Sequence, residues 1–174
     1  MCFYFAFQST FQIPKYMTTE NHKTLKKIRL TIIGFMLILA LSGISAIPVR
    51  TEINFLLGII PREWMTVRQW LQQIAEQLST CGEPLLYGFD WLAFAHIVLA
   101  INFIGVLKDP VRNIWIIEFA MISCLLIIPF TFIMAPVRGI PFWWQLIDCS
   151  FGVFGLIPLY LVRTWIQQLE KNNS

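Results

Sequence analysis

The residues that could carry chemistry are ionisable or amide side chains inside long apolar stretches of the sequence. They are His96, Asn102, Glu118, Gln145 and Asp148. An ionisable group within a membrane-spanning helix costs about 2.5–3.5 kcal/mol on insertion scales, so it normally faces protein or water and has a partner. One histidine with two carboxylates (His96, Glu118 and Asp148) could transfer protons on a lipid-like substrate.

Helical rise sorts these residues into two layers. At about 1.5 Å per residue, His96 and Asp148 each lie roughly 9–10 Å below the same end of their helices. Asn102 and Glu118 are each six residues from a basic residue at the opposite end. The sequence therefore predicts an outer layer, in which His96 pairs with Asp148, and an inner layer.

Charged residues at the ends of the same stretches complete the candidate site. They are Asp90, Arg112 and Arg138. A plainer interpretation is a packed bundle tied by hydrogen bonds, because small residues share helix faces with the polar ones: Ala93 and Ala100 with His96, and Gly152 and Gly155 with Gln145 and Asp148. Small residues let membrane helices approach closely, so both interpretations stay open.

We expect neither a metal nor another cofactor. A haem held by two imidazoles needs two histidines in the membrane, but His22 lies in a polar segment near the N-terminus. The four cysteines show no CxxC or Cys/His spacing of the kind that zinc requires. No GxSxG or HExxH motif is present.

The composition indicates which elements position these residues. Apolar and aromatic residues make up 57% of the 174 residues, and charged residues only 13%. Soluble domains carry about 25% charged residues. This balance excludes a water-soluble globule, a disordered chain and a disulfide scaffold, and it indicates an integral membrane protein.

Four apolar stretches are each about long enough to cross a hydrocarbon core of roughly 30 Å. They cover residues 30–47, 91–107, 114–135 and 142–162. The predicted fold is an all-α bundle of four transmembrane helices, with a membrane domain at 30–162, an N-terminal segment at 1–29 and a tail at 163–174. Residues 1–16 are interpreted as an extension preceding a true start at Met17, with a short interfacial anchor as the alternative.

Basic residues predict the orientation. Nine of the thirteen Lys and Arg fall on the side of the two termini and four on the opposite side, which favours cytoplasmic termini. The five before residue 30 are interpreted as this topology signal and as a contact for anionic lipid, and we expect no binding of nucleic acid.

The long connection at 48–90 then lies outside the cytoplasm and contains an amphipathic helix signal at 61–79. Pro61 suits the first helical position. Apolar residues follow at spacings of three and four: Trp64, Val67, Leu71, Ile74 and Leu78. We expect this helix to lie flat on the bilayer or to cap the bundle.

Downstream, Asp109 and Pro110 are expected to begin the third span, and Pro141 the fourth.

Three sequence blocks resemble an uncharacterised family of small bacterial membrane proteins. They are DWLAFAHIVLA (90–100), IGVLKDPVRNIWIIEF (104–119) and PVRGIPFWWQLIDCSFGVFG (136–155). The resemblance implies a bacterial inner membrane but carries no known activity. Its candidate site positions are Asp90, His96, Arg112, Glu118, Arg138 and Asp148.

The expected role is that of an accessory or interaction subunit in the membrane, because few motifs are present and little mass lies outside the bilayer. Its partners would be the lipid bilayer and a second membrane protein or further copies of the chain. One alternative is a small enzyme acting on a lipid or isoprenoid through His96, Glu118 and Asp148. Another is a proton-linked transporter, which four spans could form only as an oligomer.

Overall fold

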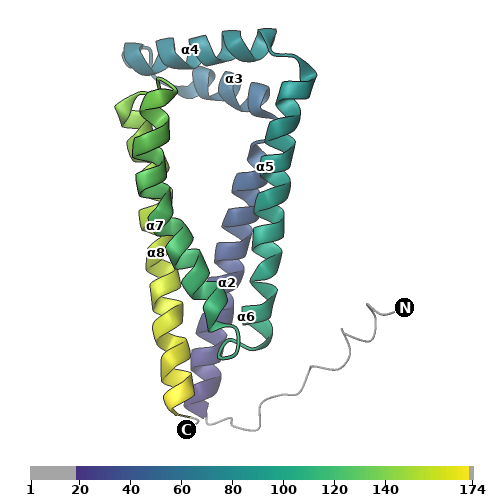
Figure 1. Cartoon of the computed structure of the whole chain (residues 1–174), viewed down its shortest axis with the longest axis vertical. Helices are drawn as coiled ribbons and strands as arrows, with labels where there is room; N and C mark the ends of the chain where they lie inside the picture. The colour runs from purple at the N-terminus through teal and green to yellow at the C-terminus, as the bar shows by residue number, and fades with distance from the viewer. Residues whose placement is uncertain (1–18, 173–174) are drawn as a thin grey trace, which may run out of the picture. The chain divides into compact units, whose positions relative to one another are not determined.

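The computed structural model describes residues 19–172, and within them the chain is all-α without strands. The expectation about the start at Met17 concerns residues outside this range. In chain order the helices are α2 (Thr19–Ser45), α3 (Val49–Ile59), α4 (Met65–Thr80), α5 (Glu83–Asn102), α6 (Ile104–Lys108), α7 (Ile114–Val137) and α8 (Phe142–Lys171) (Figure 1).

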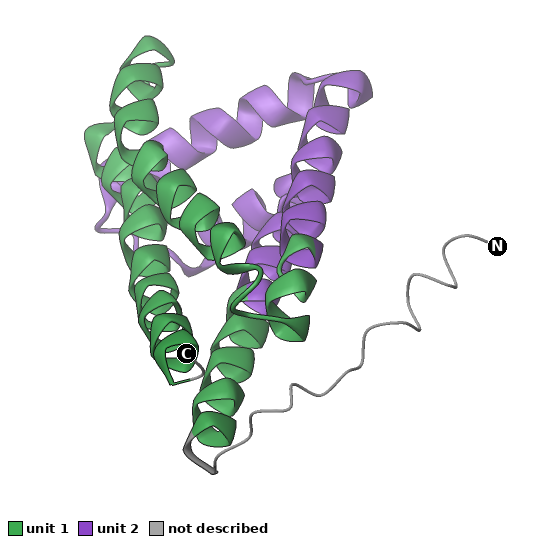
Figure 2. Ribbon diagram, turned by 60° about the horizontal axis from the view of Figure 1, so that its bottom comes forward, with its two compact units in different colours: residues 1–35, 102–174 green, residues 36–101 purple. Residues whose placement is uncertain are grey.

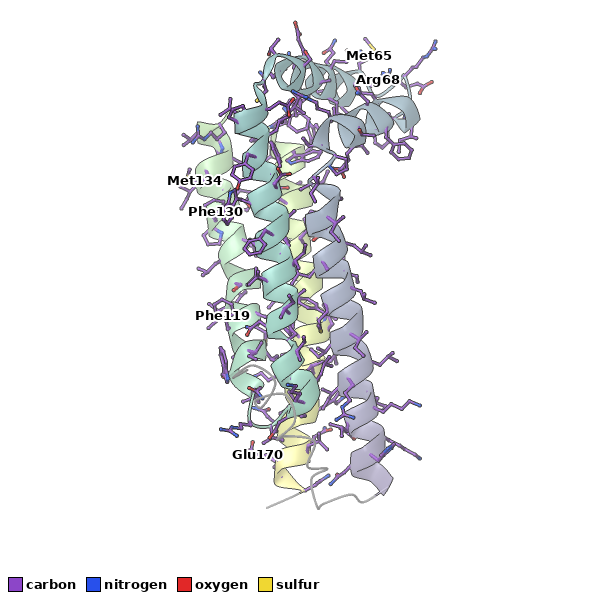
Figure 3. All side chains as sticks on the ribbon, turned by 90° about the vertical axis from the view of Figure 1, so that its right-hand side faces the viewer. Met65, Arg68, Phe119, Phe130, Met134 and Glu170 are labelled. Atoms are coloured by element: carbon purple, nitrogen blue, oxygen red, sulfur yellow. The ribbon has the colours of Figure 1, made fainter. Side chains whose placement is uncertain are left out.

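Four helical segments are long and apolar enough to cross a membrane, as predicted. They are Asn21–Ser45, Glu83–Lys108, Ile114–Val137 and Phe142–Lys171. Only 17–28% of the most apolar part of each segment is buried inside the protein. Their apolar side chains therefore point largely outward, as Phe119, Phe130 and Met134 do on α7 (Figure 3).

The helices extend beyond the apolar stretches that predicted them. α2 begins at Thr19 and includes four of the five basic residues before position 30, while α8 continues to Lys171 through the predicted tail. α5 begins at Glu83, and Pro84 lies in its first turn. Proline is tolerated there because the first N–H groups of a helix have no intrahelical partner.

Two predicted helix starts are wrong. α4 begins at Met65, four residues after Pro61, which instead accepts a hydrogen bond from the Trp64 N–H in the preceding turn (3.2 Å). α7 begins at Ile114, and Asp109 caps the turn before it by accepting a hydrogen bond from the Arg112 N–H (3.0 Å). Pro61 and Asp109 therefore belong to turns that precede α4 and α7, and neither residue begins the helix itself.

The chain divides into two compact units (Figure 2), and each is described by itself. The first unit comprises residues 1–35 and 102–174, of which the described part holds α6, α7, α8 and the first half of α2. α7 and α8 pack against each other along their length. They are antiparallel because residues 138–141 form a tight turn, in which Gly139 has a positive φ of 68°.

A close approach between backbones defines the α7–α8 seam. A Cβ at Gly152 would lie 2.5 Å from the Cys124 carbonyl oxygen, and one at Gly155 would lie 3.0 Å from the Cys124 Sγ. Larger residues at these positions would force the helices apart. Large buried side chains continue the packing of the unit: Ile28, Ile32, Val106, Ile117, Leu159, Val162 and Ile166.

The second unit comprises residues 36–101. It holds the end of α2, helices α3 and α4, and nearly all of α5. The long connection contains two helices where the sequence predicted one, because α3 precedes α4. α3 and α4 pack together with Ile53 and Leu71 buried. α2 meets α5 at Gly43, where a Cβ would overlap the His96 Cβ and lie 3.1 Å from the Ala93 carbonyl oxygen.

Candidate functional site

A charged pair, Glu118 with Arg163, lies between α7 and α8. The Arg163 Nε donates to the Glu118 Oε1 at 3.0 Å, and the two side chains are 35% and 45% exposed. Glu118 was predicted as a candidate site residue, but Arg163 was counted only as an orientation signal. The structure therefore gives the Glu118 carboxylate a cationic partner that the sequence did not reveal.

Packing in the α7–α8 seam holds this pair in place. Glu118 lies one turn into α7, and its neighbour Ile117 is fully buried. Val162, which precedes Arg163, is also fully buried. The pair therefore sits beside a packed core and neutralises a carboxylate that would otherwise lie alone on an apolar helix.

Gln145 has a local structural partner. Its side chain is buried, and its Nε2 donates to the carbonyl oxygen of Ile140 at 2.9 Å. This bond closes the turn between α7 and α8 and satisfies an amide that would be costly to bury unpaired. Gln145 therefore stabilises the start of α8.

His96 is oriented by its own helix. Its Nδ1 lies 2.8 Å from the Leu92 carbonyl oxygen. Because a carbonyl oxygen only accepts, Nδ1 carries the proton, and in the neutral imidazole Nε2 is the basic nitrogen. Asp148 is half-buried on α8 and belongs to the other compact unit. The pairing of His96 with Asp148 stays a prediction.

The remaining candidates are exposed: Asp90 lies within the first half of α5, Asn102 at the end of α5, and Arg112 and Arg138 in the turns before and after α7. Asp90 borders a shallow depression of about 220 Å³ on α5, together with Tyr87, Trp91 and Phe94. The Trp91 ring stands edge-on to both other rings, with centroid distances of 5.9 and 5.6 Å. These aromatic side chains suit a water–lipid boundary.

Arg50 caps the far end of α4, a role that the sequence did not predict. It lies in the first turn of α3, and all three of its guanidinium nitrogens donate hydrogen bonds. The acceptors are the Leu78 carbonyl (3.0 Å), the Cys81 carbonyl (2.9 Å) and the Glu83 Oε1 (2.9 Å). Helix C-termini leave carbonyls without intrahelical partners and favour cations, so both effects stabilise this contact.

Arg68 makes the reciprocal contact. From the first turns of α4, its Nη1 donates to the carbonyl oxygens of Leu57 (3.0 Å) and Ile60 (2.8 Å) at the end of α3. A third arginine, Arg29 on α2, donates to the Leu107 carbonyl at the end of α6 (3.2 Å). Three arginines that served as orientation signals in the sequence therefore also cap helices.

Within residues 19–172, no three His, Cys, Asp or Glu side chains gather closely enough to hold a metal ion. Comparison with known proteins gives no match to any family model, to any curated protein or to any solved structure. The similarity to a family of small bacterial membrane proteins stays a prediction.

Proposed function

We propose that this chain is a multi-pass integral membrane protein that acts as an accessory or interaction subunit. Four helices of sufficient length with mostly exposed apolar side chains support the membrane assignment. The nine-to-four distribution of Lys and Arg supports cytoplasmic termini. The inner-membrane location rests on the family resemblance predicted from the sequence alone.

One observation carries the accessory role: the Glu118–Arg163 pair joins α7 to α8. An acid–base catalyst needs a carboxylate that is free to exchange a proton with its substrate. The Glu118 carboxylate is instead engaged by the Arg163 guanidinium at 3.0 Å and contributes to helix packing. With Glu118 in a structural role, the exposed apolar faces become the largest surfaces available for recognition.

The enzyme alternative rests on His96. With Nδ1–H donating to Leu92, the Nε2 of a neutral imidazole could accept a proton from a lipid-like substrate. This role needs Asp148 or another group to complete the reaction. It predicts that His96→Gln abolishes the activity and leaves the amount of folded protein unchanged.

Purification of the tagged full chain in two mild detergents separates these roles. A protein partner that stays in fixed stoichiometry in both detergents, and whose removal lowers the thermal stability of the chain, supports the accessory role. A stoichiometric lipid bound by the chain and lost in His96→Gln supports the enzyme. A homo-oligomer with neither would overturn an accessory role beside a different protein and favour the transporter.

A further inference from the structure

The segment between α2 and α5 is a two-helix hairpin formed by α3 and α4, residues 49–80. Its first helix starts after a turn of three residues, 46–48, that follows α2. Its second helix ends two residues, 81–82, before α5. Two short connections thus join the hairpin to the ends of two membrane-length helices, α2 and α5. The hairpin must therefore lie close to the level at which these two helices end.

Reciprocal arginine caps close both ends of the hairpin. Arg50 at the start of α3 holds the end of α4, and Arg68 near the start of α4 holds the end of α3. Unpaired backbone carbonyls are costly where water is scarce. The caps lower this cost at two carbonyls of each helix end and occupy the two guanidinium groups, so these helix ends are suited to a region of low polarity.

The two helices of the hairpin present different surfaces. α4 exposes a polar face made of Gln69, Gln72, Gln73 and Glu76. α3 exposes two large apolar side chains one turn apart, Phe55 (65%) and Ile59 (59%). Figures 1 and 3 show α4 as the outermost helix of its unit. α3 lies below α4 in these views, on the side toward which α5 extends.

The charge of the hairpin is balanced. Residues 49–80 contain three arginines, at positions 50, 62 and 68, and three glutamates, at positions 52, 63 and 76. Electrostatic attraction to anionic lipid needs an excess of basic residues. A surface without net charge that exposes apolar side chains instead favours contact with the acyl boundary of the bilayer.

We propose that the hairpin lies in the interfacial layer of the bilayer, with Phe55 and Ile59 immersed in lipid and the glutamine face of α4 in water. The aromatic cluster of Tyr87, Trp91 and Phe94 in the first half of α5 supports this level, since such side chains favour the water–lipid boundary. The inference rests on the proposed membrane insertion of the long helices.

The test uses the full-length chain, without its native cysteines, reconstituted into phosphatidylcholine vesicles. Single cysteines carry an environment-sensitive fluorophore in three variants: Ile59→Cys on α3, Gln73→Cys on α4 and Leu126→Cys in the middle of α7. Spin-labelled lipid quenches the fluorophore from the membrane, and iodide quenches it from water. We expect lipid quenching several-fold stronger at position 59 than at position 73, and the reverse order for iodide.

Each other outcome overturns the inference in a distinguishable way. Equal iodide quenching at 59 and 73 would show that the hairpin stands in water. Shielding of position 59 from both quenchers would show that protein, such as a second copy, covers α3. If Leu126→Cys escapes lipid quenching, the proposed membrane insertion itself fails. The variant Phe55→Cys provides an independent second reading of the α3 face, and vesicles containing phosphatidylglycerol should leave the pattern unchanged.

Discussion

At the scale of single residues, the polar groups of the long helices make contacts that hold the protein together. Glu118 pairs with Arg163, Gln145 closes the turn before α8, and the His96 imidazole bonds to its own helix. Polar groups in membrane helices are costly unless partnered, so such contacts are strongly favoured. Their chemical types suggested a catalytic site, but their partners indicate stability for at least Glu118 and Gln145.

Replacing one member of the Glu118–Arg163 pair tests this conclusion. Arg163→Leu leaves an unpaired carboxylate on an apolar helix and should lower stability by about 2–3 kcal/mol. The double variant Glu118→Leu/Arg163→Leu should recover part of the lost stability, because it leaves no unpaired charge on the helix. Unfolding of the reconstituted protein by a denaturing detergent measures both variants. Additive losses would show that the two side chains do not interact.

The α7–α8 seam gives a second test at residue scale. Gly152→Ala places a methyl group 2.5 Å from the Cys124 carbonyl oxygen and should destabilise by about 1–3 kcal/mol, as overpacking usually does. Gly34→Ala is the matched control, because nothing lies within 4 Å of its added Cβ. Alanine favours helix over glycine by about 0.5–1 kcal/mol, so the control should be neutral or stabilising. Thermal unfolding in detergent distinguishes them; equal effects would contradict the close approach.

At the scale of elements, arginine caps set the geometry of the hairpin. Arg50→Gln removes the donors that satisfy the Leu78 and Cys81 carbonyls. We expect faster amide hydrogen exchange in the last turn of α4 and a stability loss of about 1–3 kcal/mol. Arg62→Gln, in the exposed turn before α4, is the charge-matched control. If both variants leave exchange in α4 unchanged, the cap does not hold that helix end.

The sequence predicted the elements that have a regular apolar pattern. Hydropathy revealed the four long helices, and spacings of three and four revealed α4. α3 escaped because its 11 residues are too few for the length criterion that revealed the four long helices. The helix ends were missed because polar residues continue a helix beyond the apolar stretch, as they do at the end of α8.

Contacts between distant residues could not be read from one sequence. Arg163 lies 45 residues from Glu118, and Arg50 lies 28 residues from the Leu78 carbonyl that it caps. Lys and Arg near the ends of spans predict an orientation from their positions alone, whatever their side chains contact. The positions of these arginines therefore gave no information about the carbonyl groups that they cap. The residue types of the candidate site were therefore predictable, but the partner of Glu118 was not.

At the scale of the whole molecule, the two ends of the described chain lie together within one unit. The Asn172 Nδ2 donates to the Asn21 Oδ1 at 3.3 Å, so the start of α2 lies beside the end of α8. If the four long apolar helices all cross a bilayer, their even number returns the chain to the side from which it started. A shared side for both termini follows from this arrangement in a bilayer, and the basic residues predict that this side is the cytoplasm.

Labelling of intact cells with a membrane-impermeant maleimide tests this orientation. In a cysteine-free chain, Gln73→Cys places an exposed thiol on the polar face of α4, and Lys171→Cys places one at the end of α8. We expect labelling at position 73 in intact cells, and at position 171 only after the membrane is permeabilised. The reverse pattern would overturn the orientation inferred from the basic residues. Labelling of both thiols in intact cells would contradict the proposed spans, because the three spans between positions 73 and 171 place these two thiols on opposite sides of the membrane.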